Sequence, residues 1–432
     1  MKKFLSTAVA LGMVAGLAAT ASALELKVTG KYVADGYYIN QGNGAAGGGG
    51  VFPFDDPDAD ADSFYWHTFR FDPTLIINDK VQVKSDIRLV DSNSVWGAQD
   101  DLQRFDGGGV RVNKLWLVYD SPIGKWEVGR RPAGAWMGGF VNSGTAADRI
   151  MWWAPAMDNF KAYAFLQKSE EKDGYVGTLE NTDNDYYEVA GGYVAEGVNA
   201  WLGLGWKADK RNDIGDIGSS QDMYRIKGYG DFKVNDTFSL AAEFDYKWGQ
   251  TEFNNNAPDV DIKSSAVIVS GMGNFGDLSA SLHYAYISGD NSDPSENTAY
   301  DVANGMGADF EPLYILTGSA CNILNGDLGP NLVGTAVRQS GAHAVVALAD
   351  FKASEDLTLH GGLGWGQADE APEMVDDAYG WELDLGLAYK LYQNLTYEVH
   401  FGWWAVGDFA ELGGLTKSED VYLLSHHLSM KF

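Results

Sequence analysis

The sequence has little cysteine, little proline and few basic residues for its length. Its 432 residues include one cysteine, Cys321, and 11 prolines. A single cysteine cannot form an intramolecular disulfide, so core packing or a closed sheet must hold the fold together. The 31 Lys and Arg residues are outnumbered by 60 Asp and Glu residues, giving a formal net charge of −29. This balance excludes nucleic acid as a plausible partner.

Motifs of metal, nucleotide and hydrolase chemistry are also missing. The seven histidines and the single cysteine form no CxxC or HExxH spacing, and there is no GxSxG motif, Walker-type loop or dinucleotide fingerprint. We therefore expect no enzyme activity, no cofactor and no specific metal site. His400 and the pair His426-His427 leave outer-membrane lipase chemistry only as a weak alternative, because no motif places a serine and an acid or amide beside them.

The first 23 residues have the composition of an export signal. Lys2 and Lys3 precede an apolar and small-residue stretch, and 21–23 read Ala-Ser-Ala, the small-x-small pattern of a signal peptidase site. After residue 23 no run of 18 or more apolar residues occurs, which excludes a transmembrane helix. The sequence predicts a signal peptide over 1–23 and one exported domain over 24–432.

Apolar and polar residues alternate with a period of two along much of the mature chain. Over 238–248 the apolar positions are Phe238, Leu240, Ala242, Phe244, Tyr246 and Trp248. The same alternation occurs in 224–234, 381–391 and 395–403. Segments of about 11 residues match a tilted strand that crosses a bilayer and are about twice the mean strand of a soluble protein. A large soluble β-sandwich, the alternative, would have shorter strands.

Short turns and long polar segments follow one another along the chain. Short turns carrying Gly, Asn, Asp or Pro lie at 78–80, 121–124, 154–159, 195–197, 235–236, 274–276, 354–356 and 392–393. Long polar segments lie at 40–62, 91–109, 132–148, 168–184, 208–222, 250–262, 289–339, 367–378 and 408–420. These turns and loops predict an all-β, transmembrane, antiparallel up-and-down barrel of eighteen strands, with sixteen as the alternative. This is the organisation of an outer-membrane barrel. In lipid a sheet must close so that no edge is unpaired, which is why the barrel is one domain.

Three segments of the sequence resemble parts of one known family of membrane barrels. Phe432 ends an alternating last strand, 126–130 reads Trp-Glu-Val-Gly-Arg, and Asp148 to Pro155 is followed by Asn159 to Tyr163. Together they resemble the trimeric porins of Gram-negative outer membranes. The resemblance implies a water-filled channel for passive diffusion of small hydrophilic solutes and ions. It also implies a homotrimer among outer-membrane lipid and lipopolysaccharide, with Phe432 as the signal read by the barrel assembly machinery.

The resemblance further implies that the third long segment folds into the lumen and narrows it. In the family this loop supplies acids opposite a wall of arginines, but here no acid occurs between Pro132 and Ala147. A basic constriction without an acidic counterwall predicts a weak preference for anions. The residues expected at the constriction are Arg70, Lys84, Arg88, Arg130, Arg131, Arg149, Trp136 and Asp148. Strict alternation turns Arg131 inward, whereas the family motif points to Arg130, which would need a bulge.

Two alternatives remain for the lumen. Inward Asp72, Asp86, Glu243 and Asp245 could neutralise the basic residues in ion pairs and leave a nearly unselective pore. Inward Trp66 and Trp116 could instead form a sugar-stacking track, in a channel selective for a sugar or an oxyanion.

The alternation also assigns other side chains to a face. Trp152 and Trp153 are expected in an aromatic girdle at the membrane interface, and His426 on the lipid face. Leu385 is expected on the lipid face and Gly386 in the lumen, where a serine should be tolerated.

Acidic residues gather in the long segments. The first carries Asp55, Asp56, Asp58, Asp60 and Asp62, and the eighth carries Asp369, Glu370, Glu373, Asp376 and Asp377. Such runs are ordinarily solvated faces. Beside lipopolysaccharide phosphates they could instead gather diffusely bound Ca²⁺ or Mg²⁺ at the outer rim, because hard cations prefer oxygen ligands.

Overall fold

The computed structural model describes residues 24–42, 60–95, 110–134, 136, 138–141, 146–171, 183–213, 218–255, 257–300, 312–317, 340–411 and 418–432. Almost all regular structure in this part of the chain is β-strand. The barrel strands are β1 (Glu25–Gly42), β2 (Asp60–Ile76), β3 (Val81–Val95), β4 (Arg111–Ser121), β5 (Gly124–Pro132), β6 (Ala146–Trp153), β7 (Phe160–Glu170), β8 (Asn184–Ala195), β9 (Val198–Asn212), β10 (Ser219–Lys233), β11 (Phe238–Phe253), β12 (Val260–Phe275), β13 (Leu278–Ile287), β15 (Ala342–Lys352), β16 (Leu357–Gln367), β17 (Ala378–Tyr392), β18 (Leu395–Val406) and β19 (Val421–Lys431). Within the described ranges no helix is long and apolar enough to cross a membrane.

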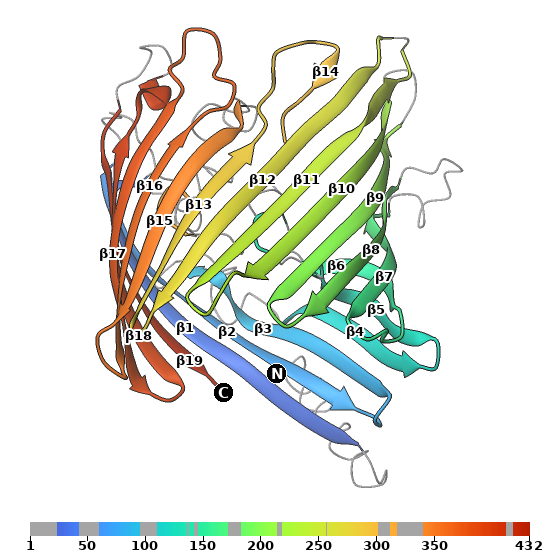
Figure 1. Cartoon of the computed structure of the whole chain (residues 1–432), viewed down its shortest axis with the longest axis horizontal. Coiled ribbons are helices and arrows are strands. Elements are labelled where there is room, and N and C mark those ends of the chain that lie inside the picture. Colours follow the sequence, from blue (N-terminus) through green and yellow to red (C-terminus); the bar gives the residue numbers. More distant parts are fainter. Residues whose placement is uncertain are drawn as a thin grey trace, which may run out of the picture.

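These strands form one closed antiparallel sheet (Figure 1). Each strand pairs with its neighbours in chain order, and β1 closes the barrel by pairing with β19 from Lys31 opposite Lys431 to Ile39 opposite Leu423. The two-residue strand β14 (Glu296–Asn297) pairs with β12 above the wall and is not a barrel strand. The prediction of an eighteen-stranded barrel is therefore confirmed for the described chain, and the alternative of sixteen strands is wrong.

All eight predicted turns join consecutive strands at one end of the barrel. Asparagine side chains shape two of them. The Asn78 Oδ1 atom accepts the N–H groups of Lys80 and Val81, each at 2.9 Å. Asn235 does the same for the two residues that follow its turn, at 2.8 Å each. Such side-chain bonds replace the ladder bonds that are lost where the chain reverses.

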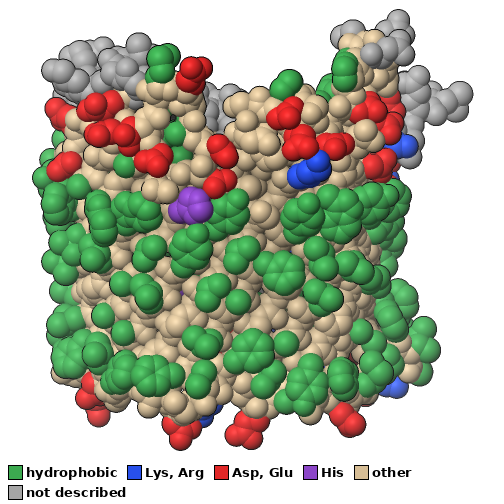
Figure 2. Space-filling view, turned by 45° about the horizontal axis from the view of Figure 1, so that its top comes forward, with side chains coloured by type: hydrophobic (Ala, Val, Ile, Leu, Met, Phe, Trp, Pro, Cys, Tyr) green, Lys and Arg blue, Asp and Glu red, His purple; other side chains and the backbone are tan. Residues whose placement is uncertain are grey.

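The two faces of the wall differ in polarity, as the alternation predicts. Along β11, Leu240 is 51% exposed on the outer face, whereas Glu243 and Asp245 on the inner face are 3% and 1% exposed. On the face drawn in Figure 2, hydrophobic side chains cover the middle of the outer wall, with acidic side chains gathered above and below them. The outer face therefore suits lipid, and the charges lie in the lumen or at the rims.

The buried apolar core lies inside the lumen. Phe140 and Val141 of the third loop are buried there, in one cluster with Leu313 and Ile315 from the segment 312–317, which lies between β13 and β15 in the chain. The inward-folded third loop is thus confirmed, and a second loop segment joins it. Together they narrow the lumen from two sides.

One girdle residue was assigned to the wrong face. Trp152 faces outward, and its Nε1–H donates to the carbonyl of Ile123 at 2.8 Å. Trp153 faces the lumen instead, with its ring 5.0 Å from Tyr163 and 6.4 Å from Trp201 between centroids. Adjacent residues of a strand point to opposite faces, so both tryptophans cannot belong to one girdle.

Candidate functional site

Basic side chains from three neighbouring strands lie side by side on the lumen wall. Lys31 on β1 is directly opposite Arg70 on β2, and Arg70 is directly opposite Arg88 on β3. Like charges directly opposite one another destabilise a sheet. This basic row therefore costs folding free energy, which points to a functional reason for it.

Carboxylates neutralise the basic row only in part. One oxygen of Asp86 lies 3.8 Å from the Nε atom of Arg88, and the other lies 3.5 Å from the Nζ atom of Lys114. Arg70 has no carboxylate within ion-pair distance among the described residues, and its buried Nε atom makes no hydrogen bond there. Lys84 lies opposite Trp116 on β4. The ion-pair alternative thus applies to Arg88 and not to Arg70.

The two arginines at the end of β5 take different positions. Arg131 is buried, with its Nε atom 2.7 Å from the Glu127 carboxylate. Arg130 lies in register with Leu115, and its guanidinium forms a 2.7 Å ion pair with Asp148 on β6. Both members of this pair line the cavity beside the third loop. The strands β4 and β5 pair without a register shift, so alternation alone sets this arrangement.

Arg149 on β6 faces the lumen and holds the start of the third loop. Its Nε atom donates to Gln167 at 2.7 Å, and its Nη1 atom donates to the carbonyl of Ala133. Its guanidinium lies 3.9 Å from the ring centroid of Phe165. These are neutral partners, and no carboxylate in the described part lies within ion-pair distance of Arg149. No ion pair in the described part therefore cancels its charge.

The third loop lies against β7, β9 and β11. Trp136 stacks on Trp201 with 5.7 Å between ring centroids, and its indole N–H donates to the hydroxyl of Tyr163. Further along, the N–H of Val141 donates to the Glu243 carboxylate at 2.8 Å. One of the acids proposed to neutralise the arginines therefore binds the loop backbone instead.

A cavity of about 480 Å³ lies between this loop and the wall from β6 to β11. Most of its ionisable side chains are basic. They are Arg130, Arg149, Lys168, Lys207, Arg211, Arg225, Lys227 and Lys247, against the acids Asp148 and Glu188. Aromatic side chains complete the lining, namely Trp136, Tyr163, Phe165 and Tyr186.

Buried carboxylates behind the cavity surface partner several of these cations. Arg225 pairs with Asp245, and Lys227 lies 2.6 Å from Glu188. The Lys247 ammonium lies 3.7 Å from the ring centroid of Tyr300, whose hydroxyl donates to Asp245 at 2.6 Å. Burial and the nearby Asp245 charge raise the pKa of the Tyr300 hydroxyl well above its usual value, so this loop residue stays a neutral donor.

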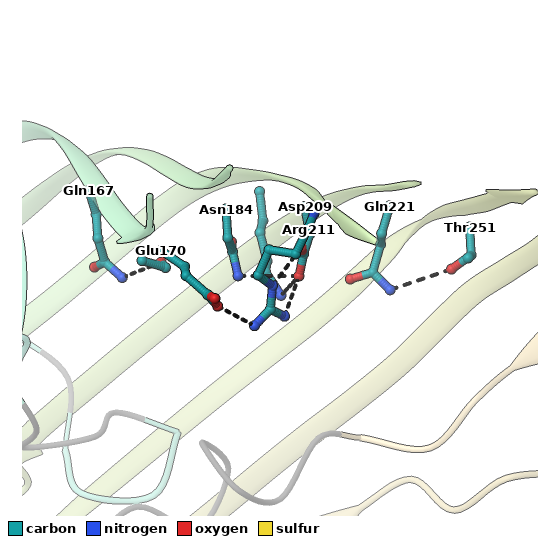
Figure 3. Close-up of polar contacts among 9 residues, drawn as sticks. Gln167, Glu170, Asn184, Asp209, Arg211, Gln221 and Thr251 are labelled. Atoms are coloured by element: carbon teal, nitrogen blue, oxygen red, sulfur yellow. Dashed lines mark hydrogen bonds and ion pairs between the residues drawn. The ribbon is translucent and has the colours of Figure 1, made fainter. Parts of the chain in front are cut away.

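A polar network covers the upper part of the same wall (Figure 3). Arg211 on β9 donates to Glu170 at 3.0 Å and to Asp209 at 2.8 Å. Asn184 on β8 donates to the second oxygen of Asp209 at 3.2 Å. A separate pair lies further along the sheet, where Gln221 donates to the hydroxyl of Thr251 at 3.4 Å. The upper part of the cavity wall is therefore polar, as a solute path requires.

The cavity cations on β10 and β11 are absent from the predicted constriction. Their positions were visible in the alternation, because Arg225 and Lys227 occupy the polar face of 224–234 and Lys247 that of 238–248. The family resemblance directed attention to β2, β3, β5 and β6 instead. The third loop contacts both parts of the wall, through Arg149 on β6 and Glu243 on β11.

The two inward tryptophans line different parts of the wall. Trp66 donates its indole N–H to Asp35 at 2.9 Å and packs against Tyr37, with 4.9 Å between ring centroids. Trp116 lies on β4, opposite Lys84 on β3, whereas Trp66 lies on β2.

The histidines that raised the lipase alternative do acquire partners. His427 lies 2.6 Å from Asp35 and 3.2 Å from the hydroxyl of Ser425 in the lumen. However, Ser425 sits on a strand paired on both sides, opposite Tyr37 and His400, so the surrounding N–H groups belong to the ladder. No oxyanion hole is formed by such a strand. His426 faces outward as predicted, between Tyr65 and Tyr397.

Other predicted residues fall outside the described part. The signal peptide 1–23, Asp55, Asp56, Asp58 and Cys321 belong to this group. Asp60 and Asp62 lie in β2, and the structure does not describe their side chains.

No family model matches the sequence, and no curated protein matches it. Solved structures with a similar fold include OprD from Pseudomonas aeruginosa, with 12% identity over 94% of this chain and 95% of that chain and a TM-score of 0.55. A BenF-like porin from Pseudomonas fluorescens Pf-5 has 12% identity over 94% and 99%, with a TM-score of 0.54. OccK3 (OpdO) from Pseudomonas aeruginosa has 11% identity over 94% and 96%, with a TM-score of 0.52. The fold is therefore that of Gram-negative outer-membrane porins, which agrees with the predicted location in the outer membrane.

Proposed function

We propose that this chain forms a water-filled channel for passive diffusion of small hydrophilic solutes and ions across the outer membrane, with a weak preference for anions. The observation that supports the preference is uncancelled positive charge in the narrowed lumen. Arg70 and Arg149 have no carboxylate within ion-pair distance in the described part, and the third loop brings no acid between Pro132 and Ala147. Confined charges of this kind are screened less than exposed ones.

The test is the reversal potential of single channels in a KCl gradient across a planar bilayer. Wild-type protein should favour chloride, and Arg70→Gln with Arg149→Gln should move the reversal potential towards the potassium value. Lys80→Gln is the matched control, because Lys80 is exposed in the turn between β2 and β3. A wild-type channel that clearly favours potassium at molar salt would contradict the proposal.

A second candidate is a channel selective for one class of anion, and the cavity lining favours it. Arg149 lies over Phe165, and the Lys227 ammonium lies 5.4 Å from the ring centroid of Trp136. Cations beside aromatic faces can hold a solute that carries both an anionic group and an apolar body. A selective channel should show ion current that millimolar solute blocks with saturation, whereas a general diffusion pore should not.

The resemblance also motivates proposals about the surroundings. We propose a homotrimer in contact with lipopolysaccharide, inserted by the barrel assembly machinery, with Ca²⁺ or Mg²⁺ gathered near acidic loops such as 367–378. Native electrophoresis of protein extracted in mild detergent tests the trimer. A band of monomer size under these conditions would argue against it.

A further inference from the structure

The segment 312–317 lies inside the lumen against the wall formed by β16, β17 and β18. Leu313, Ile315, Leu316 and Thr317 are each 1% exposed or less. The N–H of Leu313 donates to the hydroxyl of Thr317 at 2.8 Å, which closes the segment into a tight turn. The segment is therefore an ordered, packed element of the lumen.

Glycines on the inner face of the wall make room for this turn. A Cβ atom at Gly364 would lie 2.2 Å from the Cδ1 atom of Leu313, and one at Gly402 would lie 3.2 Å from the Cδ1 atom of Ile315. A Cβ atom at Gly386 would lie 2.6 Å from the hydroxyl of Tyr314. Three strands thus lack a side chain where the turn touches them, so the wall is a fitted receptor for it.

Two buried carboxylates hold the backbone of the turn. Glu382 accepts the N–H groups of Ile315 at 2.7 Å and Leu316 at 2.6 Å, and Asp384 accepts that of Tyr314 at 3.0 Å. Both acids are 0% exposed. Within the described ranges no Lys, Arg or His forms an ion pair with either of them. Peptide N–H groups rather than cations therefore bind three of the four carboxylate oxygens, and the fourth, Oδ1 of Asp384, is buried without a hydrogen-bond partner in the described part.

We propose that segment 312–317 is an internal cover that hides the acidic pair Glu382 and Asp384 from the lumen and closes that side of the channel. With the cover in place, permeating ions meet the basic row and the basic cavity but not these two acids. Without it, the lumen is wider and exposes two carboxylates with no bound cation, which attract cations. The inference rests on the proposed channel function and adds the element that sets its charge preference.

The first test displaces the cover from the wall side. In Gly364→Val the new side chain overlaps Leu313, whereas in the matched control Gly361→Val it enters a position with no neighbour within 4 Å. We expect a larger unit conductance and a reversal potential shifted towards the potassium value in Gly364→Val, and neither change in Gly361→Val. The heat-dependent shift of the folded barrel in electrophoresis shows that both variants fold. Leu313→Gln, which leaves the wall intact, should reproduce the result.

The second test separates widening from charge. The triple variant Gly364→Val, Glu382→Gln, Asp384→Asn should keep the larger conductance but lose the shift towards potassium. A larger conductance without a shift in Gly364→Val and Leu313→Gln would show that the segment only occludes, and unchanged conductance in both would show that it covers nothing. The reversal potential of each variant is compared with that of the wild type. A wild-type channel that prefers cations would therefore overturn the proposed anion preference, while the difference between variant and wild type would still test the cover.

Discussion

At the residue scale, glycines in this barrel lie where a large neighbouring side chain crosses the strand. On the lumen side Leu313 lies over Gly364, and on the outer side the Phe432 ring lies over Gly30, with its Cζ atom 2.3 Å from where a Cβ would stand. The abundance of glycine, 53 of 432 residues, thus has a local cause at these positions. An aromatic ring that covers a strand glycine replaces the packing that the glycine lacks.

The first prediction concerns Phe432. Its ring also lies 6.2 Å from that of Phe69, and its backbone exchanges two hydrogen bonds with Gly30, of 2.9 and 3.1 Å. Phe432→Asp should lower the amount of assembled barrel in cells, since a charge replaces an apolar ring on the lipid face. Purified protein can also be folded into liposomes, which contain no assembly machinery. This experiment distinguishes a packing role of Phe432 from a role as an assembly signal.

If Phe432 acts through packing, Phe432→Asp and Gly30→Val should both fold poorly in liposomes, because valine would collide with the ring. If Phe432 acts as a signal for the assembly machinery, Phe432→Asp should fold normally in liposomes and fail only in cells. Normal outer-membrane levels of Phe432→Asp would argue against both roles.

At the element scale, alternation decides which face of each strand tolerates charge. Leu385 on β17 is 55% exposed on the outer face, and its neighbours in sequence, Asp384 and Gly386, face the lumen. The expectation that serine is tolerated at Gly386 stays a prediction, and the structure adds a neighbour at this position. A Cβ atom there would lie 2.6 Å from the Tyr314 hydroxyl, so the glycine is part of the receptor for the cover.

The second prediction uses the same strand. Leu385→Arg should destabilise the folded barrel by about 2–4 kcal/mol, because it places a cation in the apolar belt near mid-strand. Ala388→Ser on the lumen side is the control and should change stability little. Urea titration of barrels in liposomes measures both. Equal stability of the two variants would mean that the inner and outer faces are assigned the wrong way round.

At the scale of the whole molecule, charge of opposite sign lies at different depths. The lumen carries the basic row and the basic cavity, whereas Figure 2 shows acidic side chains around the upper rim. Exposed rim charges are screened beyond roughly 8 Å at physiological salt and beyond about 3 Å at 1 M, whereas charges in a confined lumen are screened less. The two sets should therefore dominate under different conditions.

The third prediction follows from this separation. The preference for anions should be weakest at low ionic strength, where the rim attracts cations, and should grow towards molar salt. Reversal potentials at a fixed concentration ratio but increasing absolute salt measure the trend. Neutralising Glu370 and Glu373, which are exposed in the segment between β16 and β17, should raise anion preference mainly at low salt. A preference that falls as salt rises would show that the lumen charges are the ones being screened.

The barrel itself follows from local features of the sequence. Period-two alternation sets the two faces, and Asn, Asp and Gly at the turns set where strands reverse. Each feature acts between residues close in the chain, so the strand number and all eight turns could be predicted from it. The inward third loop was expected only from the family resemblance. Trp153 shows the limit of residue type as a guide, because its place on the strand and not its aromatic character decided its face.

The lumen depends on contacts between distant parts of the chain. The alternation placed Arg225, Lys227 and Glu382 on inward faces, but neither pattern nor spacing said what would lie against them. The tertiary structure decides which acid pairs with which base and which acids are covered by loop backbone. Such contacts join residues far apart in the chain, as when the N–H of Tyr314 meets Asp384, 70 residues later. Strand pairing is dictated by neighbours in sequence, whereas the charge that a solute meets is set by how two loops fold back through a closed sheet.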